Sequence, residues 1–158
     1  MSGYQDYLVD IRLYKATALI SAFLLLTTSL LAINTPEAKI GAVIRNYFDA
    51  LLRVNLTNAI PYTTGQLRQN LTAYREQLEQ SAVVSGYSGS MRDITINIVE
   101  LRDNYAKASV TVLSNIRTND IPHSIFERFF DVELALVNGE WRIVTSIQRS
   151  FNIYDVNN

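Results

Sequence analysis

The stretch FFDVELALVNGEWRIVTSIQ, Phe129 to Gln148, decides the fold class of this chain. Apolar residues alternate with polar ones on both sides of its centre, at Phe130, Val132, Leu134 and Leu136 and then at Trp141, Ile143 and Ile147. A period of two is typical of strands with one buried face. Asn138-Gly139 lies between the halves and favours a type I′ turn, because that turn needs positive φ at both central residues. We therefore predict two antiparallel strands joined by a tight hairpin.

Two further strands are predicted upstream of this hairpin. The same alternation places apolar side chains at Ala106, Ala108, Val110 and Val112, and earlier at Ile94, Ile96 and Ile98. After Ile98 the apolar positions shift to Val99 and Leu101, as a β-bulge would cause. The sequence therefore predicts a four-stranded antiparallel meander whose first strand is bent.

Two amphipathic helices are expected before the strands. Thr35 can cap the first, Pro36 suits its first position, and Glu37 favours the positive end of the helix dipole. Its apolar stripe comprises Ile40, Val43, Ile44, Tyr47, Phe48, Leu51 and Leu52. The second helix follows Thr63 and Thr64 and has a narrower stripe, expected to lie on a core: Leu67, Leu71, Tyr74 and Leu78. Pro61 separates the two helices, and SGYSGS, residues 85–90, is predicted as a flexible break. Helices followed by a meander indicate an α+β domain.

The segment ATALISAFLLLTTSLLAIN, Ala16 to Asn34, contains no charged residue. About 20 apolar residues cross a bilayer core of roughly 30 Å. Its end, SLLAIN, lacks the small residues of a signal-peptide cleavage site. We therefore predict a retained transmembrane helix at 16–34, between a short tail at 1–15 and a domain at 35–158. Arg12 and Lys15 form the tighter basic flank, which favours a cytoplasmic tail and a domain outside the membrane.

Composition narrows the classes of function. The chain has 14 basic and 15 acidic residues, and its formal net charge is -1. Bulk electrostatics therefore gives no reason to expect a nucleic-acid partner. The absence of cysteine excludes disulfides, thiolate zinc sites and cysteine nucleophiles. With His123 as the single histidine, a histidine metal cluster is also excluded. We predict no metal and no cofactor.

The element order, together with the ending FFDVELALVNGEWRIVTSIQ, resembles the nuclear transport factor two-like cone fold over roughly Glu37 to Phe151. In that fold a strongly curved sheet wraps around N-terminal helices. One branch also carries a short tail and a single membrane helix before the cone. It comprises the bitopic assembly factors of bacterial type IV secretion and conjugation systems, of the VirB-eight type, and this chain is similar to a short version of them.

Some cone-fold enzymes use Asp, His or Tyr side chains in the cavity, and Asp131, Tyr105 and His123 are the nearest candidates here. His123 follows Pro122 at a strand entrance, where a loop residue is expected more often than a general base. Asp131 and Glu133 alternate with apolar neighbours, which predicts carboxylates on the face opposite the core. We therefore predict no catalytic residue and no enzymatic activity.

The expected function is a single-pass inner-membrane protein whose periplasmic domain docks other subunits of a membrane assembly, such as a type IV secretion or conjugation channel. Arg68 and Arg75 are the candidate partner-binding residues, because the stripe from Leu67 to Leu78 commits another side of that helix to the core. The lipid bilayer and protein subunits are the expected partners, and a homo-oligomer is left open. Two alternatives remain: an accessory subunit of another membrane complex, and an anchored cone that binds or converts a small molecule.

Overall fold

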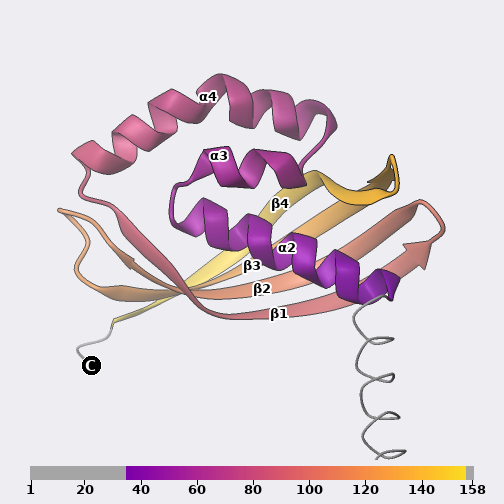
Figure 1. The fold of residues 1–158 in the computed structure, drawn as a ribbon. Helices are drawn as coiled ribbons and strands as arrows, with labels where there is room; N and C mark the ends of the chain where they lie inside the picture. Colours follow the sequence, from indigo (N-terminus) through magenta and orange to yellow (C-terminus); the bar gives the residue numbers. More distant parts are fainter. Residues whose placement is uncertain (1–34, 156–158) are drawn as a thin grey trace, which may run out of the picture. The chain divides into compact units, whose positions relative to one another are not determined.

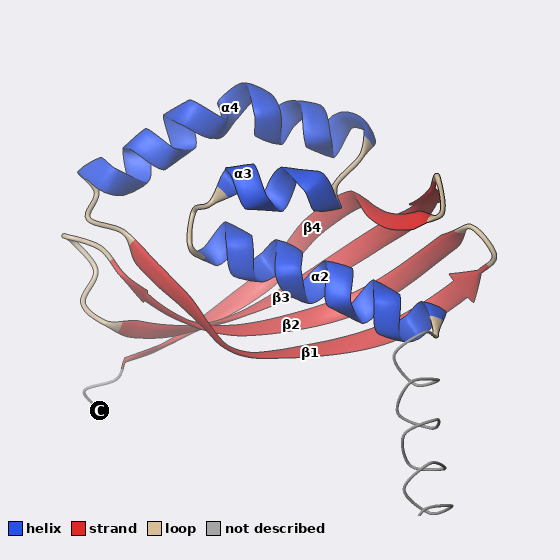
Figure 2. Ribbon diagram, viewed as in Figure 1, coloured by secondary structure: helices blue, strands red, loops and turns tan. Residues whose placement is uncertain are grey.

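The structure, a computed structural model, describes residues 35–155 (Figures 1 and 2). The elements are α2 (Pro36–Leu52), α3 (Leu56–Ala59), η1 (Ile60–Tyr62), α4 (Gly65–Val84), β1 (Ser88–Arg102), β2 (Tyr105–Arg117), β3 (Ser124–Val137) and β4 (Glu140–Asp155). The predicted α+β class is confirmed. The predicted tail at 1–15 and membrane helix at 16–34 lie outside the described residues. Within residues 35–155, no helix combines the length and the apolar character that a bilayer span needs.

The four strands form one antiparallel meander in the order β1-β2-β3-β4, as predicted. Asn138 and Gly139 have φ angles of 53° and 81°, which fit the expected hairpin turn. The pairing of β1 with β2 shifts register between Ile98 and Glu100, where the sequence predicted a bulge, and also between Met91 and Asp93. Such bulges bend a strand, and the sheet curves around the helices in Figure 1.

A register shift on β4 corrects one detail of the predicted hairpin. Glu133 pairs with Thr145 and Leu134 pairs with Ile143, so Val144 is an extra residue on β4. The extra residue reverses the alternation of side chains beyond it. Ile143 is fully buried, whereas Ile147 is 61% exposed. The predicted apolar face of this strand therefore ends before Ile147.

The α2 helix forms as predicted and supplies the helical half of the core. The Ala38 backbone N–H donates to Thr35 Oγ1 at 3.2 Å, which caps the helix start. The predicted stripe is largely buried, and it packs against the inner face of the sheet in one hydrophobic cluster: Ile40, Ile44, Tyr47, Phe48 and Leu52 from α2, with Ala106, Ala108, Val110, Val112, Val132, Leu134, Trp141 and Ile143 from the strands.

The segment between α2 and α4 contains two short helices that the sequence patterns do not predict. The Asn55 side chain accepts a hydrogen bond from the Asn58 backbone N–H at 3.2 Å and caps α3. Glu79 of α4 accepts a second bond, from the Leu56 backbone N–H at 3.2 Å. Pro61 lies in η1, between the two long helices as expected. The α3 helix has only four residues, too few for a helical period to show in the sequence.

The α4 helix differs from the prediction. None of its 20 residues is fully buried. Leu67 and Leu71 pack against the core as half-buried side chains, but Tyr74 and Leu78 are 57% and 46% exposed. Only the first half of the predicted stripe therefore meets the core.

The SGYSGS segment is more ordered than the predicted flexible break. β1 already begins at Ser88. The Asn119 backbone N–H, in the loop between β2 and β3, donates to the Ser85 carbonyl at 2.8 Å. Gly86 has a φ of 63°, and a Cβ there would lie 2.2 Å from Asn119 Oδ1. Only glycine fits this turn, so the segment is held in place by the neighbouring loop.

Candidate functional site

A cavity lies between the end of α2 and the inner face of the sheet. Its volume is about 130 Å³. Its walls come from α2, the start of β1, and strands β2, β3 and β4: Phe48, Leu51, Leu52, Tyr87, Val112, Arg128, Phe130 and Gln148. Five of the eight lining residues are apolar, and Arg128 is the one with a charged side chain. The cavity is therefore an apolar hollow with a cation in its wall.

Arg128 is unusual because its half-buried side chain has no carboxylate partner among the described residues. One terminal nitrogen, Nη2, donates to Ser114 Oγ at 3.1 Å. The buried Nε has no hydrogen-bond partner. None of the ion pairs formed within residues 35–155 involves Arg128. A buried donor without a partner costs about 1–3 kcal/mol.

Tyr87 is the second polar group of the cavity, and Gly89 makes room for it. A Cβ at position 89 would lie 2.3 Å from the Tyr87 hydroxyl and 2.3 Å from the Leu52 carbonyl oxygen. Glycine thus lets the α2 terminus and the tyrosine ring approach the same point of β1. The Tyr87 hydroxyl lies beside the Arg128 guanidinium. The residue just before β1 therefore places a hydroxyl next to the cation.

Arg128 and Tyr87 set the electrostatics of the cavity. Burial raises the pKa of Tyr87, and the neighbouring Arg128 partly offsets this rise. Burial also lowers the pKa of Arg128, and Tyr87 partly opposes that change. An arginine stays charged in proteins, and a tyrosine with a raised pKa stays neutral at pH 7. The described lining residues include no Asp, Glu or His. The cavity can therefore hold an anion, but it offers no general base for neutral pH.

The three catalytic candidates from the sequence are not brought together. His123 is exposed in the loop before β3 and borders a separate hollow with Ser88, Asn115 and Arg117. Asp131 lies eight residues further along the chain, roughly 25 Å in an extended strand. Tyr105 is on the outer face beside Glu133. Tyr105 pairs with Ala135 of β3, four residues beyond Asp131 on the same face, which is roughly 13 Å along the strand.

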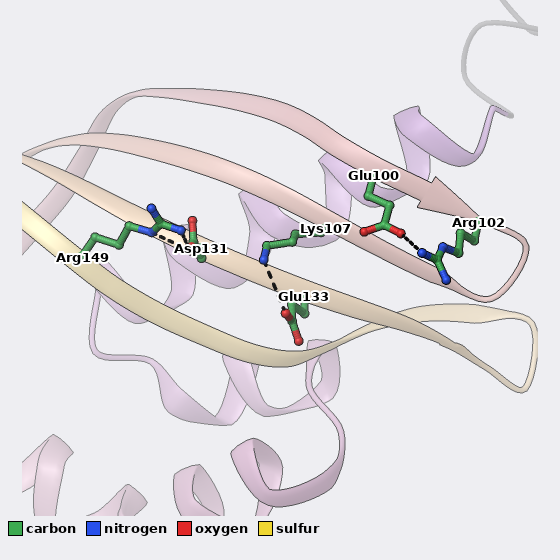
Figure 3. Close-up of polar contacts among 6 residues, drawn as sticks. All are labelled: Glu100, Arg102, Lys107, Asp131, Glu133 and Arg149. Atoms are coloured by element: carbon green, nitrogen blue, oxygen red, sulfur yellow. Dashed lines mark hydrogen bonds and ion pairs between the residues drawn. The ribbon is translucent and has the colours of Figure 1, made fainter.

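The predicted placement of Asp131 and Glu133 is confirmed. Both carboxylates lie on the outer face of the sheet, while Val132 and Leu134 between and beyond them are fully buried. Asp131 forms an ion pair with Arg149, and Glu133 Oε1 lies 3.9 Å from Lys107 Nζ (Figure 3). Solvent-exposed pairs of this kind contribute about 0–1 kcal/mol each. The carboxylates are paired surface groups.

The two arginines proposed for partner binding lie on α4. Arg68 is exposed, and the Arg75 side chain is 39% exposed with its Nη2 atom 3.5 Å from Glu76 Oε1. Arg75 is thus less exposed than Tyr74, contrary to the predicted division between an apolar stripe and a charged remainder. The arginines and the exposed apolar residues share one side of the helix.

Arg128 was missed because its strand has apolar residues on both faces. Ile125 and Phe129 lie on one face of β3, and Phe126 and Phe130 lie on the other. The apolar pattern around Arg128 therefore does not indicate which face of β3 is buried. Counting back in steps of two from the buried Val132 would have placed Arg128 on the inner face, and this was the available signal. Within residues 35–155, no group of three or more potential ligands is arranged to hold a metal ion.

Comparisons with known proteins show the fold. No protein-family model matches the chain, and no curated sequence matches it. Several solved structures are similar, among them the following three. A protein proposed to be a scytalone dehydratase from Novosphingobium aromaticivorans has a TM-score of 0.52 and 18% identity, over 82% of this chain and 92% of that one. The Kfla4162 protein of Kribbella flavida has a TM-score of 0.50 and 11% identity, over 75% of this chain and 95% of that one. The intermembrane space region of the chloroplast protein ARC6 has a TM-score of 0.50 and 10% identity, over 69% of this chain and 92% of that one. The chain has the nuclear transport factor two-like cone fold, with its curved antiparallel sheet.

Proposed function

We propose that this chain is a membrane-anchored, non-catalytic docking subunit. Its cone domain lies outside the cytoplasm and binds other protein subunits of an inner-membrane assembly, of the type IV secretion or conjugation kind. The uncharged run at 16–34 and the basic flank of Arg12 and Lys15 support the anchor and its orientation. The separation of His123, Asp131 and Tyr105 supports a role without acid–base chemistry.

The observation that carries the docking role is the unburied state of α4. A 20-residue helix in water normally gains its stability by burying one face, yet none of its residues is fully buried. Leu78 lies four residues after Tyr74 and three after Arg75, so it neighbours both of them on the helix surface. Exposed tyrosine and arginine are enriched at protein interfaces and at their energetic centres. We infer that this side, called here the α4 docking surface (Arg68, Tyr74, Arg75 and Leu78), is covered by a partner subunit.

Photo-crosslinking in native membranes tests this assignment. A photo-reactive amino acid at Tyr74 should give adducts with other polypeptides of the assembly. The same amino acid at Ser109, an exposed position on the β2 strand, serves as the matched control and should give few adducts. Adducts from Ser109 but not from Tyr74 would move the docking surface to the sheet.

The orientation can be tested separately because the chain has no cysteine. Single cysteines at Ser2 and at Ser88 should differ in their access to an impermeant thiol reagent on intact cells. We expect Ser88→Cys to react and Ser2→Cys to be protected. Labelling at position 2 alone would reverse the predicted topology.

The cavity favours a second candidate function, in which the anchored cone binds a small molecule. Arg128 supports it, because a half-buried cation without a carboxylate is unfavourable for folding and is explained by a ligand. The two functions use different surfaces, and both can belong to one subunit.

A further inference from the structure

We propose that the cavity between α2 and the sheet binds a small monocarboxylate with an apolar carbon skeleton, whose carboxylate lies against Arg128 and the Tyr87 hydroxyl. This proposal does not depend on the docking function, because the α4 docking surface contributes none of the residues that line the cavity.

The charge of the site selects an anion. The Arg128 guanidinium has five N–H donors; one reaches Ser114, and the Nε–H has no partner. A carboxylate arriving at this side chain would supply the missing counter-charge, since none of the ion pairs within residues 35–155 involves Arg128. Charge-assisted hydrogen bonds between arginine and carboxylate are stronger than bonds between neutral groups.

The remaining polar groups select one carboxylate. The Tyr87 hydroxyl lies beside the guanidinium, and the Gln148 amide is the third polar side chain of the lining. Both can donate a hydrogen bond to a second carboxylate oxygen. A single arginine with two neutral donors balances a charge of minus one, whereas a phosphate dianion would need further cations.

The walls and the volume select the carbon skeleton. Phe48, Phe130, Val112 and two leucines provide apolar and aromatic surface. A cavity of about 130 Å³ is close to the engineered cavity of about 150 Å³ that binds benzene. An aromatic ring or an alkyl chain of about four to six carbons therefore fits, with its carboxylate at the Arg128 end.

Calorimetric titration of the full chain in detergent tests the proposal with sodium benzoate and with benzyl alcohol. The two probes share the ring and differ in charge. We expect benzoate to bind at least tenfold more tightly than benzyl alcohol. Equal affinities, or no binding of benzoate, would overturn the proposal. Inorganic phosphate should not compete, and tighter binding of phosphate than of benzoate would also refute it.

Variants of Arg128 connect the affinity to the cavity. Arg128→Met should lower the benzoate affinity at least tenfold and leave benzyl alcohol binding nearly unchanged. Arg149→Met, on the outer face, is the matched control and should change neither. Arg128→Lys keeps the charge but loses the planar fork, so it should bind benzoate with an intermediate affinity. This variant decides the matter if Arg128→Met does not fold: wild-type affinity in Arg128→Lys would contradict the assignment.

A third comparison separates a free acid from the end of a partner chain, because both present a carboxylate on an apolar group. A short peptide with a C-terminal phenylalanine carries a phenyl ring and a carboxylate, as benzoate does, but it is a larger ligand. We expect it to bind more weakly than benzoate, since the cavity admits only about one ring. Tighter binding of the peptide would overturn the small-molecule assignment.

Discussion

Replacing Arg128 with methionine should stabilise the fold while it removes the anion site. Most substitutions of half-buried residues are destabilising by about 1 kcal/mol, so the expected sign is unusual. It follows from the contacts of the guanidinium. The buried Nε–H has no partner, no described carboxylate neutralises the charge, and the apolar wall of the cavity suits a methionine of similar length.

The magnitude follows from the groups that are gained and lost. Removing the unpartnered donor and the desolvated charge recovers about 2–4 kcal/mol. The lost bond to Ser114 Oγ costs about 1.5–3 kcal/mol, because its donor is charged. Ser114 keeps a partner, because its hydroxyl also donates to the Phe126 carbonyl at 3.3 Å. The net expectation is a gain of about 0.5–1 kcal/mol in the free energy of unfolding.

Urea unfolding of the full chain in detergent measures this gain. Trp141 is the single tryptophan of the sequence and is only 6% exposed, so its fluorescence follows the unfolding of the cone. Arg149→Met serves as the control and should lose less than about 1 kcal/mol with its exposed ion pair. A loss of more than about 1 kcal/mol in Arg128→Met would refute the reasoning, because it would assign the arginine to the stability of the fold.

Three further predictions concern the core and the cavity wall. Trp141→Ala should cost about 3–5 kcal/mol in urea unfolding, the range for a large aromatic removed from a core. Because this variant lacks the single tryptophan, its unfolding would be followed by circular dichroism. A cost below about 1 kcal/mol would contradict the burial of Trp141. Burial raises the pKa of Tyr47 to about 12, and a hydrogen bond with Ser146 partly opposes this rise. The stability that the neutral hydroxyl contributes is therefore complete below pH 10 and is lost as the pH rises toward 12. Tyr47→Phe should reduce the alkaline fall in the free energy of unfolding by about 2–3 kcal/mol, and an unchanged fall would exclude Tyr47 as its source. Gly89→Ala should destabilise the fold by about 1–3 kcal/mol, because its Cβ would overlap backbone and side-chain atoms. Gly41→Ala, whose Cβ would lie in open space on α2, should stabilise the fold by up to about 1 kcal/mol. Similar effects at both sites would contradict the tight contact at Gly89.

The parts of the fold that the sequence predicted depend on local patterns. The turn at Asn138-Gly139 needs two positive φ angles, and few other dipeptides provide them. The bulge near Val99 shows as a phase change in the apolar residues. Ile147 could not be placed in the same way, because Val144 is itself apolar and hides the extra residue. The reversal of the strand face is thus visible only in the pairing with β3.

The parts of the site that the sequence did not predict depend on tertiary context. An amphipathic stripe predicts that a helix has an apolar side, but it does not say which protein covers that side. Tyr74 and Leu78 were therefore assigned to the core of this chain, although the described fold leaves them exposed. Arg128 was missed because apolar residues on both faces of β3 obscure the direction of its side chain. Arg68 and Arg75 remain a prediction as partner-binding residues.

Co-purification from native membranes tests the docking role most directly. Tagged full-length chains would be compared as wild type, as Arg68→Glu with Arg75→Glu, and as His123→Ala with Asp131→Asn. Docking through α4 predicts that the double arginine variant loses its partner subunits while the cone stays folded by circular dichroism. The His123 and Asp131 variant should retain both its partners and the working assembly. Normal capture of partners by the arginine variant, together with loss of function in the His123 and Asp131 variant, would contradict the docking account and indicate chemistry instead.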